Sequence, residues 1–73
     1  MSKSIQILKK IGQEIKAQRI KAGLTQIELA ELCGFDNTYI SMLERGQRNI
    51  PILTLIHISE KLEIKASDLI KNA

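Results

Sequence analysis

The sequence predicts an all-α protein, a compact five-helix bundle that forms a single domain over residues 1–73. Apolar residues recur at intervals of three and four, which is the spacing of one face of a helix. Glycines and the single proline, Pro51, divide the chain into short segments. Phe, Tyr and Trp together contribute only Phe35 and Tyr39, and a core built instead from Leu, Ile and Ala packs well between helices.

The first predicted helix covers residues 4–22 and carries one apolar stripe. The stripe consists of Ile5, Leu8, Ile11, Ile15 and Ala22. Gly23 follows directly, and a glycine suits a left-handed C-terminal cap because it has no Cβ. One long amphipathic helix is therefore expected to end at Gly23.

A second, shorter helix is predicted over residues 26–33. Thr25 and Glu28 have the spacing of a capping box, in which each side chain accepts a hydrogen bond from the other residue's amide. Gly34 then ends the helix. The residues that we expect it to bury are Leu29, Ala30 and Leu32.

The third predicted helix follows Asp36, a good N-cap residue, and has two distinct faces. With about 100° per residue, one face carries Asn37, Thr38, Ser41 and Arg45, which we call the polar strip. The opposite face carries Tyr39, Ile40 and Leu43, and Glu44 lies at the boundary between the two.

The last third of the chain predicts a fourth helix over residues 51–62 and a short fifth helix over residues 65–71. Pro51 is acceptable in a first helical turn. Leu55, Ile56 and Leu62 can cluster toward the core, whereas Leu53 points away from them. An exposed apolar patch marks a contact surface, so we expect a homodimer. The predicted interface residues are Leu53, Ile50, Leu69 and Ile70.

The second and third helices are separated by a tight turn at Gly34, which predicts a helix-turn-helix at about residues 26–45. The second helix of this motif enters the major groove of DNA. Asn pairs with adenine, Ser and Thr bond to several bases, and Arg binds guanine or phosphate. Asn37, Thr38 and Ser41 are therefore predicted to read bases; an ordinary solvated helix surface is the alternative.

The net charge of +3 is unevenly distributed along the chain. Residues 1–24 hold six basic residues and one acid, a balance of +5; residues 25–49 hold two and four, a balance of −2; residues 50–73 hold three of each. A basic first third favours attraction to a polyanion. A solvated Lys-rich helix face explains the same charges equally well.

Other classes of function find little support. The sequence shows no nucleophile–base pair, metal cluster or phosphate-binding glycine loop, so we expect no enzyme activity, metal or cofactor. It has no apolar run long enough to span a membrane, and its single cysteine, Cys33, suits the reducing cytoplasm. Cys33 is interpreted as a small buried hydrophobe rather than a redox sensor. His57 is interpreted as a surface or interface residue rather than a metal ligand.

Several motifs agree in register over about residues 11–70. They are Arg19, the run Gly23-Leu24-Thr25-Gln26, the pair Leu29-Ala30, Gly34, Ile40 and the run Leu43-Glu44-Arg45-Gly46. With these motifs the chain resembles the lambda-repressor-like helix-turn-helix domains of the phage-repressor-like family. Tyr39-Ile40-Ser41 and the run from Glu44 to Asn49 are most similar to the controller proteins of restriction–modification systems.

The resemblance implies a role for each matching residue. Asn37, Thr38 and Ser41 match base-reading positions, and Tyr39 matches a position near the DNA backbone or bases. The residues implied to contact phosphates are Gln26, Arg45, Gln47, Arg48 and Asn49. Arg19 and Glu44 match a pair that forms an internal salt bridge. For Arg48 and Asn49, a role in shaping the turn is the alternative.

Two positions depart from the family pattern. Controller-like proteins commonly have Arg where this chain has Asn37, so the resemblance does not supply the operator sequence. The family usually has a polar residue where this chain has Leu53, which makes this surface of the fourth helix unusually apolar.

The sequence thus predicts a DNA-binding transcriptional regulator that binds a pseudo-palindromic operator as a homodimer without a small-molecule effector. A controller protein of a restriction–modification system is the finer expectation, with regulation through the protein's own concentration. An antitoxin-like protein-binding module of the same fold, which also represses its own operon, is the alternative. Such a module needs a segment that grips its partner. Because the sequence ends at residue 73 without one, we expect DNA binding to be the principal activity.

Overall fold

The computed structural model describes residues 2–73, and all regular secondary structure in this range is helical. The helices are α1 (Lys3–Lys21), α2 (Gln26–Cys33), α3 (Asn37–Glu44), α4 (Ile52–Lys61) and α5 (Ser67–Ile70). The predicted all-α fold class and the order of the helices are confirmed. Helix α5 is shorter than predicted, because the Lys65 amide donates to the Asp68 carboxylate at 3.2 Å and the chain enters the helix through a turn.

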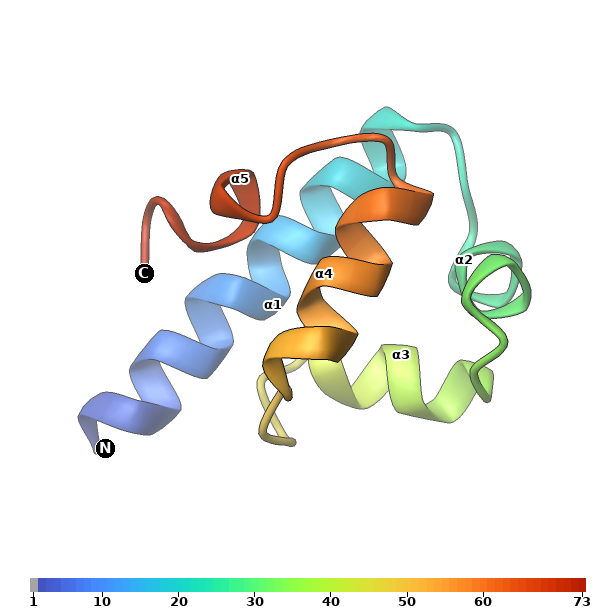
Figure 1. The fold of residues 1–73 in the computed structure, drawn as a ribbon. Helices are drawn as coiled ribbons and strands as arrows, with labels where there is room; N and C mark the ends of the chain where they lie inside the picture. The colour runs from blue at the N-terminus through green and yellow to red at the C-terminus, as the bar shows by residue number, and fades with distance from the viewer. Residues whose placement is uncertain (1) are drawn as a thin grey trace.

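Helix α1 is the longest element, and it runs across the bundle (Figure 1). It contacts α3 and α5, while α2 contacts α3 and α4. Helix α3 lies along the bottom of the bundle in this view, next to α2. In residues 2–73, none of these helices is long and apolar enough to cross a membrane.

The core draws one fully buried side chain from each helix. Ile15, Leu29, Ile40, Ile58 and Leu69 are each at most 1% exposed. Burying a side chain of this size stabilises the fold by roughly 1.5–3 kcal/mol. The five helices are therefore held by one shared apolar cluster, and α3 is fixed to it through Ile40.

The end of α3 also packs directly on the backbone of α1. A Cβ added to Gly12 would lie 2.4 Å from the Leu43 carbonyl oxygen and 2.5 Å from the Glu44 carbonyl oxygen. One placed on Gly46, which has a φ of 71°, would lie 2.7 Å from Lys9 Cγ. Two glycines thus permit the close approach that fixes the end of α3 against α1.

Several predictions of buried residues were wrong. Leu32 is 49% exposed, and Cys33 takes its place in the core because the buried side of α2 centres on Leu29, Ala30 and Cys33. On α4, Ile56 is 39% exposed. The start of the apolar stripe on α1 is also exposed at Ile5, because the first turns of α1 extend beyond the other helices (Figure 1).

Candidate nucleic-acid interface

The turn between α2 and α3 sets the direction in which α3 leaves the bundle. Gly34 has a φ of 73°, in the left-handed region that favours glycine. The Phe35 amide then donates to the Ala30 carbonyl at 2.8 Å, which closes α2. The Asp36 carboxylate accepts from the Thr38 amide at 2.8 Å and caps α3, as predicted. This turn leaves the first residues of α3 at the surface.

Helix α3 has the two faces that its sequence predicts. Ile40 is fully buried and Leu43 is 3% exposed, so these side chains belong to the core. On the polar strip, Asn37, Thr38 and Arg45 are exposed, and Ser41 is half-buried. The donors and acceptors of the strip are therefore available to a ligand along most of the helix.

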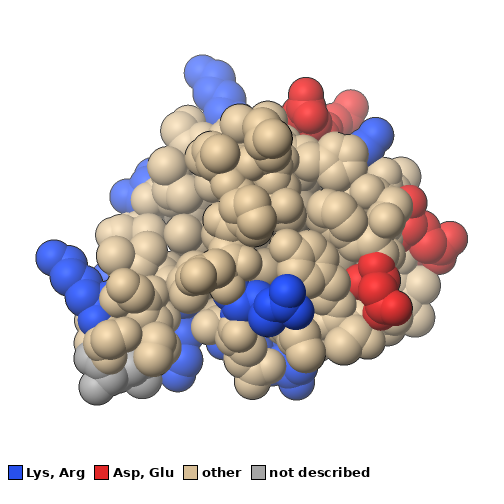
Figure 2. Space-filling view, turned by 60° about the horizontal axis from the view of Figure 1, so that its bottom comes forward, with Lys and Arg blue, Asp and Glu red and all other residues tan. Residues whose placement is uncertain are grey.

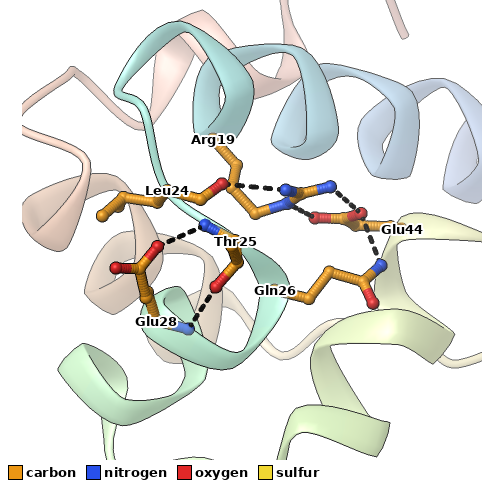
Figure 3. Close-up of polar contacts among 6 residues, drawn as sticks. All are labelled: Arg19, Leu24, Thr25, Gln26, Glu28 and Glu44. Atoms are coloured by element: carbon orange, nitrogen blue, oxygen red, sulfur yellow. Dashed lines mark hydrogen bonds and ion pairs between the residues drawn. The ribbon is translucent and has the colours of Figure 1, made fainter.

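Glu44, which the helix geometry placed at the boundary of the two faces, is a buried acid paired with Arg19 (Figure 3). Arg19 Nε donates to Glu44 Oε2 at 2.6 Å, and Nη2 donates to Oε1 at 3.1 Å. Arg19 Nη1 also donates to the Leu24 carbonyl at 2.9 Å. This two-point pairing joins α1, the loop that follows it and the last residue of α3.

Gln26 joins the same network from the start of α2 (Figure 3). Its Nε2 donates to Glu44 Oε1 at 2.9 Å. A primary amide carries a second N–H, so this contact orients the side chain and still leaves one donor for another acceptor. The capping box of Thr25 and Glu28, predicted from the sequence, is present and holds the α2 N-terminus with bonds of 2.8 and 3.1 Å. Gln26 is thus positioned before any ligand binds.

Tyr39 of α3 is in contact with Arg48, which lies in the loop after α3. Arg48 Cζ lies 5.5 Å from the centroid of the Tyr39 ring, and Arg48 Nη1 lies 3.9 Å from Met42 Sδ. The sequence patterns did not predict Met42 as a site residue. Its position on α3, about 40° from Thr38 by helix geometry, borders the polar strip. Gln47 and Asn49 flank Arg48 in the exposed loop.

The charges on this side of the molecule are separated. Figure 2 shows the lower face of the bundle, with most of the Lys and Arg surface toward the left and centre, and with Asp and Glu toward the right, where some basic surface lies beside them at the upper edge. The basic side belongs to α1 and the loop after α3, and the acidic side to the α2 end of the molecule. A polyanion bound along α3 is therefore favoured at the end of α3 that lies against α1.

Cys33 and His57 support the turn from the interior. Cys33 is 7% exposed, which confirms its interpretation as a buried hydrophobe. Burial raises the pKa of the Cys33 thiol, and the nearby Lys61 charge offsets part of the rise. His57, which we expected at the surface or at an interface, is partly covered within the single chain. This residue is half-buried, its Nε2 lies 2.9 Å from the Cys33 carbonyl oxygen, and its ring packs 5.6 Å from that of Phe35. Among residues 2–73, no cluster of three or more His, Cys, Asp or Glu is placed to hold a metal ion.

The residues predicted for a dimer interface have different environments. Leu53 is 75% exposed and Ile70 is 44% exposed. Ile50 is half-buried against the core, and Ile52, which the prediction omitted, is 64% exposed. Placing Leu69 at the interface was wrong: this side chain is 1% exposed because it fills the core where α5 packs on α1.

Comparison with known proteins identifies the architecture. A family model described as helix-turn-helix matches residues 15–69. The chain is 36% identical over 62 residues to the uncharacterized HTH-type transcriptional regulator y4dJ of Sinorhizobium fredii, covering 85% of this chain and 80% of that protein. It is 35% identical over 71 residues to the control protein C.BamHI of Bacillus amyloliquefaciens, covering 96% of this chain and 85% of that protein.

A solved structure gives the same result. The crystal structure of the restriction–modification controller protein C.AhdI from Aeromonas hydrophila is similar with a TM-score of 0.82 and 37% sequence identity, covering 85% of this chain and 94% of that one. The family resemblance seen in the sequence is confirmed by both kinds of comparison. The chain belongs to the helix-turn-helix family that contains these transcriptional regulators.

Proposed function

We propose that this protein regulates transcription by placing α3 in the major groove of an operator and reading its sequence with the polar strip. The observation that carries the proposal is the exposure of Asn37, Thr38 and Arg45 on a helix whose other face is locked into the core. A rigid helix loses little conformational freedom when it binds, so its hydrogen bonds contribute more fully to affinity.

Within this proposal, Asn37, Thr38 and Ser41 read base edges. The Asn37 amide can donate and accept at once, which suits adenine, and the Thr38 methyl can pack on a thymine methyl. Phosphate contacts come from Gln26, Arg45, Gln47, Arg48 and Asn49. The buried pair of Arg19 and Glu44 supports this proposal by holding Gln26 and α3 in one arrangement.

The protein acts as a homodimer in this proposal. Leu53 is 75% exposed and Ile52 is 64% exposed on the same helix, and apolar side chains of this size gain free energy when a partner covers them. A two-fold dimer presents two copies of α3, which suits a pseudo-palindromic operator with half-sites about 34–36 Å apart or a multiple of that spacing. Occupancy of the operator then depends on the concentration of the protein itself, with no small-molecule effector.

The finer proposal is control of a restriction–modification system. It rests on the similarity to C.BamHI and C.AhdI, a control protein and a restriction–modification controller protein by name. An endonuclease gene and a methyltransferase gene beside the gene for this chain would support this assignment. If neither gene lies nearby, the protein would instead be assigned as a regulator of other genes.

Selection from a library of random duplexes tests the function as a whole. The wild-type protein should enrich one two-fold symmetric sequence, and binding to it should weaken linearly with the logarithm of salt concentration as counterions are released. Failure to enrich any sequence would overturn the proposal. A protein-binding role without DNA recognition would then be the better account of the exposed apolar side chains on α4.

A further inference from the structure

Arg48 lies in an exposed loop, yet its guanidinium is held against α3. The group lies over the Tyr39 ring with Cζ 5.5 Å from the centroid, and Nη1 donates to Met42 Sδ at 3.9 Å. Both partners belong to α3. The loop side chain is therefore directed along the helix that carries the polar strip.

The Tyr39 ring is itself fixed from behind. The Phe35 ring meets it edge-on, with centroids 5.2 Å apart and an interplanar angle of 86°. Phe35 in turn packs against the half-buried His57 ring at 5.6 Å. A series of ring contacts thus runs from α4 through the helix-turn-helix turn to Tyr39 and supports the ring that Arg48 contacts.

A cation–π contact with a ring uses none of the N–H donors of a guanidinium. Arg48 Nη1 is directed at Met42 Sδ, so the Nε and Nη2 donors remain for a carboxylate or a phosphate. A free Arg side chain loses about 2 kcal/mol of rotamer entropy when it is fully ordered. An Arg that is already held against a ring and a thioether has lost part of that freedom before DNA binds.

We propose that Tyr39 is a positioning residue, whose ring and the neighbouring Met42 thioether hold Arg48 beside the polar strip for contact with a DNA phosphate. This role differs from a direct contact of the Tyr39 hydroxyl with DNA, because it needs only the ring. The proposal rests on the proposed function, since Arg48 must bind a phosphate for its orientation to matter.

The test compares Tyr39→Phe with Tyr39→Leu, each with Arg48 intact and with Arg48→Gln. Tyr39→Phe removes the hydroxyl and keeps the ring, so any direct hydroxyl contact is lost equally in both Tyr39 variants. Binding is measured on a duplex selected by the wild-type protein and on a random-sequence duplex. Thermal denaturation of every variant fixes the folded fraction used to calculate affinity.

With Arg48 intact, Tyr39→Leu should bind both duplexes about three- to tenfold more weakly than Tyr39→Phe, the effect of losing one cation–π contact. With Arg48→Gln, the same comparison should give a difference below about twofold, since no guanidinium remains to be held. The slope of the logarithm of the binding constant against the logarithm of the salt concentration should be equal in the two Tyr39 variants. Its magnitude should fall by about one unit with Arg48→Gln. An equal loss in both Arg48 backgrounds would overturn the proposal.

Arg48→Lys keeps the test decisive if Tyr39→Leu does not fold. Lysine retains the charge but lacks the planar group that stacks on a ring. This variant should bind more weakly than the wild type with an unchanged salt slope, whereas wild-type affinity would overturn the proposal. Failure of the proposed function is separate, because it would appear earlier, as a wild-type protein that selects no duplex.

Discussion

Arg19 and Glu44 tie α1 to the last residue of α3 through a buried ion pair, with Arg19 Nε 2.6 Å from Glu44 Oε2. Their side chains are 10% and 3% exposed. Removing one partner leaves the other charge buried without compensation, which costs about 3–5 kcal/mol. The pair therefore makes the placement of α3 depend on a contact in the interior of the protein.

Glu44→Ala should lower the free energy of unfolding by about 3–5 kcal/mol, because Arg19 would lose its carboxylate and Gln26 its acceptor. Thermal denaturation measures the effect. Glu31→Ala, at an exposed position of α2, is the matched control and should change little. A Glu44→Ala protein with wild-type stability and abolished DNA binding would place Glu44 at the DNA instead.

Gly12→Ala should destabilise the protein, although Ala is the better helix former. In an exposed helix interior this change stabilises by about 1 kcal/mol. Here the added Cβ would lie 2.4 Å from the Leu43 carbonyl oxygen, and forced overpacking typically costs about 1–3 kcal/mol. Urea denaturation should show reduced stability, with Lys16→Ala on the exposed side of α1 as the control. A more stable Gly12→Ala protein would mean that α1 and α3 are not in backbone contact.

Asn37→Ala should separate base reading from general DNA affinity. Loss of a paired contact to a base costs about 1–3 kcal/mol on the preferred duplex and relaxes the preference at that position. Binding to random-sequence DNA should barely change, because Asn37 carries no charge. Competition binding on both duplexes is the measurement. Equal weakening on both would assign Asn37 to the backbone rather than to the bases.

Local signals in the sequence predict most of this fold. The Thr25–Glu28 capping box and the Asp36 N-cap are short-range hydrogen-bonding patterns. Each is present in the structure at the residues where the sequence predicts it. The two faces of α3 follow from helix periodicity, which places Ile40 and Leu43 on the face that is buried in the core. Such features depend on residues that lie within about one helical turn of each other, so a single sequence is enough to predict them.

Features that depend on contacts between helices were less predictable. Gly12 occupies a helix interior, and nothing local indicates that α3 approaches it. The burial of Leu69, the exposure of Leu32 and the half-buried state of His57 all depend on which neighbouring helix covers each position. The contact of Arg48 with Tyr39 links a loop to a helix face, and spacing along the chain does not reveal it.

The Cys33 thiol should react slowly with iodoacetamide in the folded protein at neutral pH. Burial raises its pKa, an effect only partly offset by Lys61, so the reactive thiolate is scarce. A raised folded pKa means that the folded state binds the proton more tightly than the unfolded state. Its contribution to stability is therefore complete below the unfolded pKa and is lost as pH rises through the folded pKa. Alkylation rates with and without denaturant should differ strongly, and equal rates would contradict a buried thiol.

Leu53→Glu should give a folded monomer with greatly weakened operator binding. Leu53 is 75% exposed in the single chain, so a charge there does not disturb the core. In a two-fold dimer its burial counts twice, at roughly 1.5–3 kcal/mol for each copy, so losing both weakens association by a hundredfold or more. Sedimentation at micromolar concentration measures the change, and Ile70→Glu on α5, at 44% exposure, is the comparison. If Leu53→Glu still sediments as a dimer and Ile70→Glu does not, the interface lies on α5, and the two copies of α3 are related by a different two-fold axis.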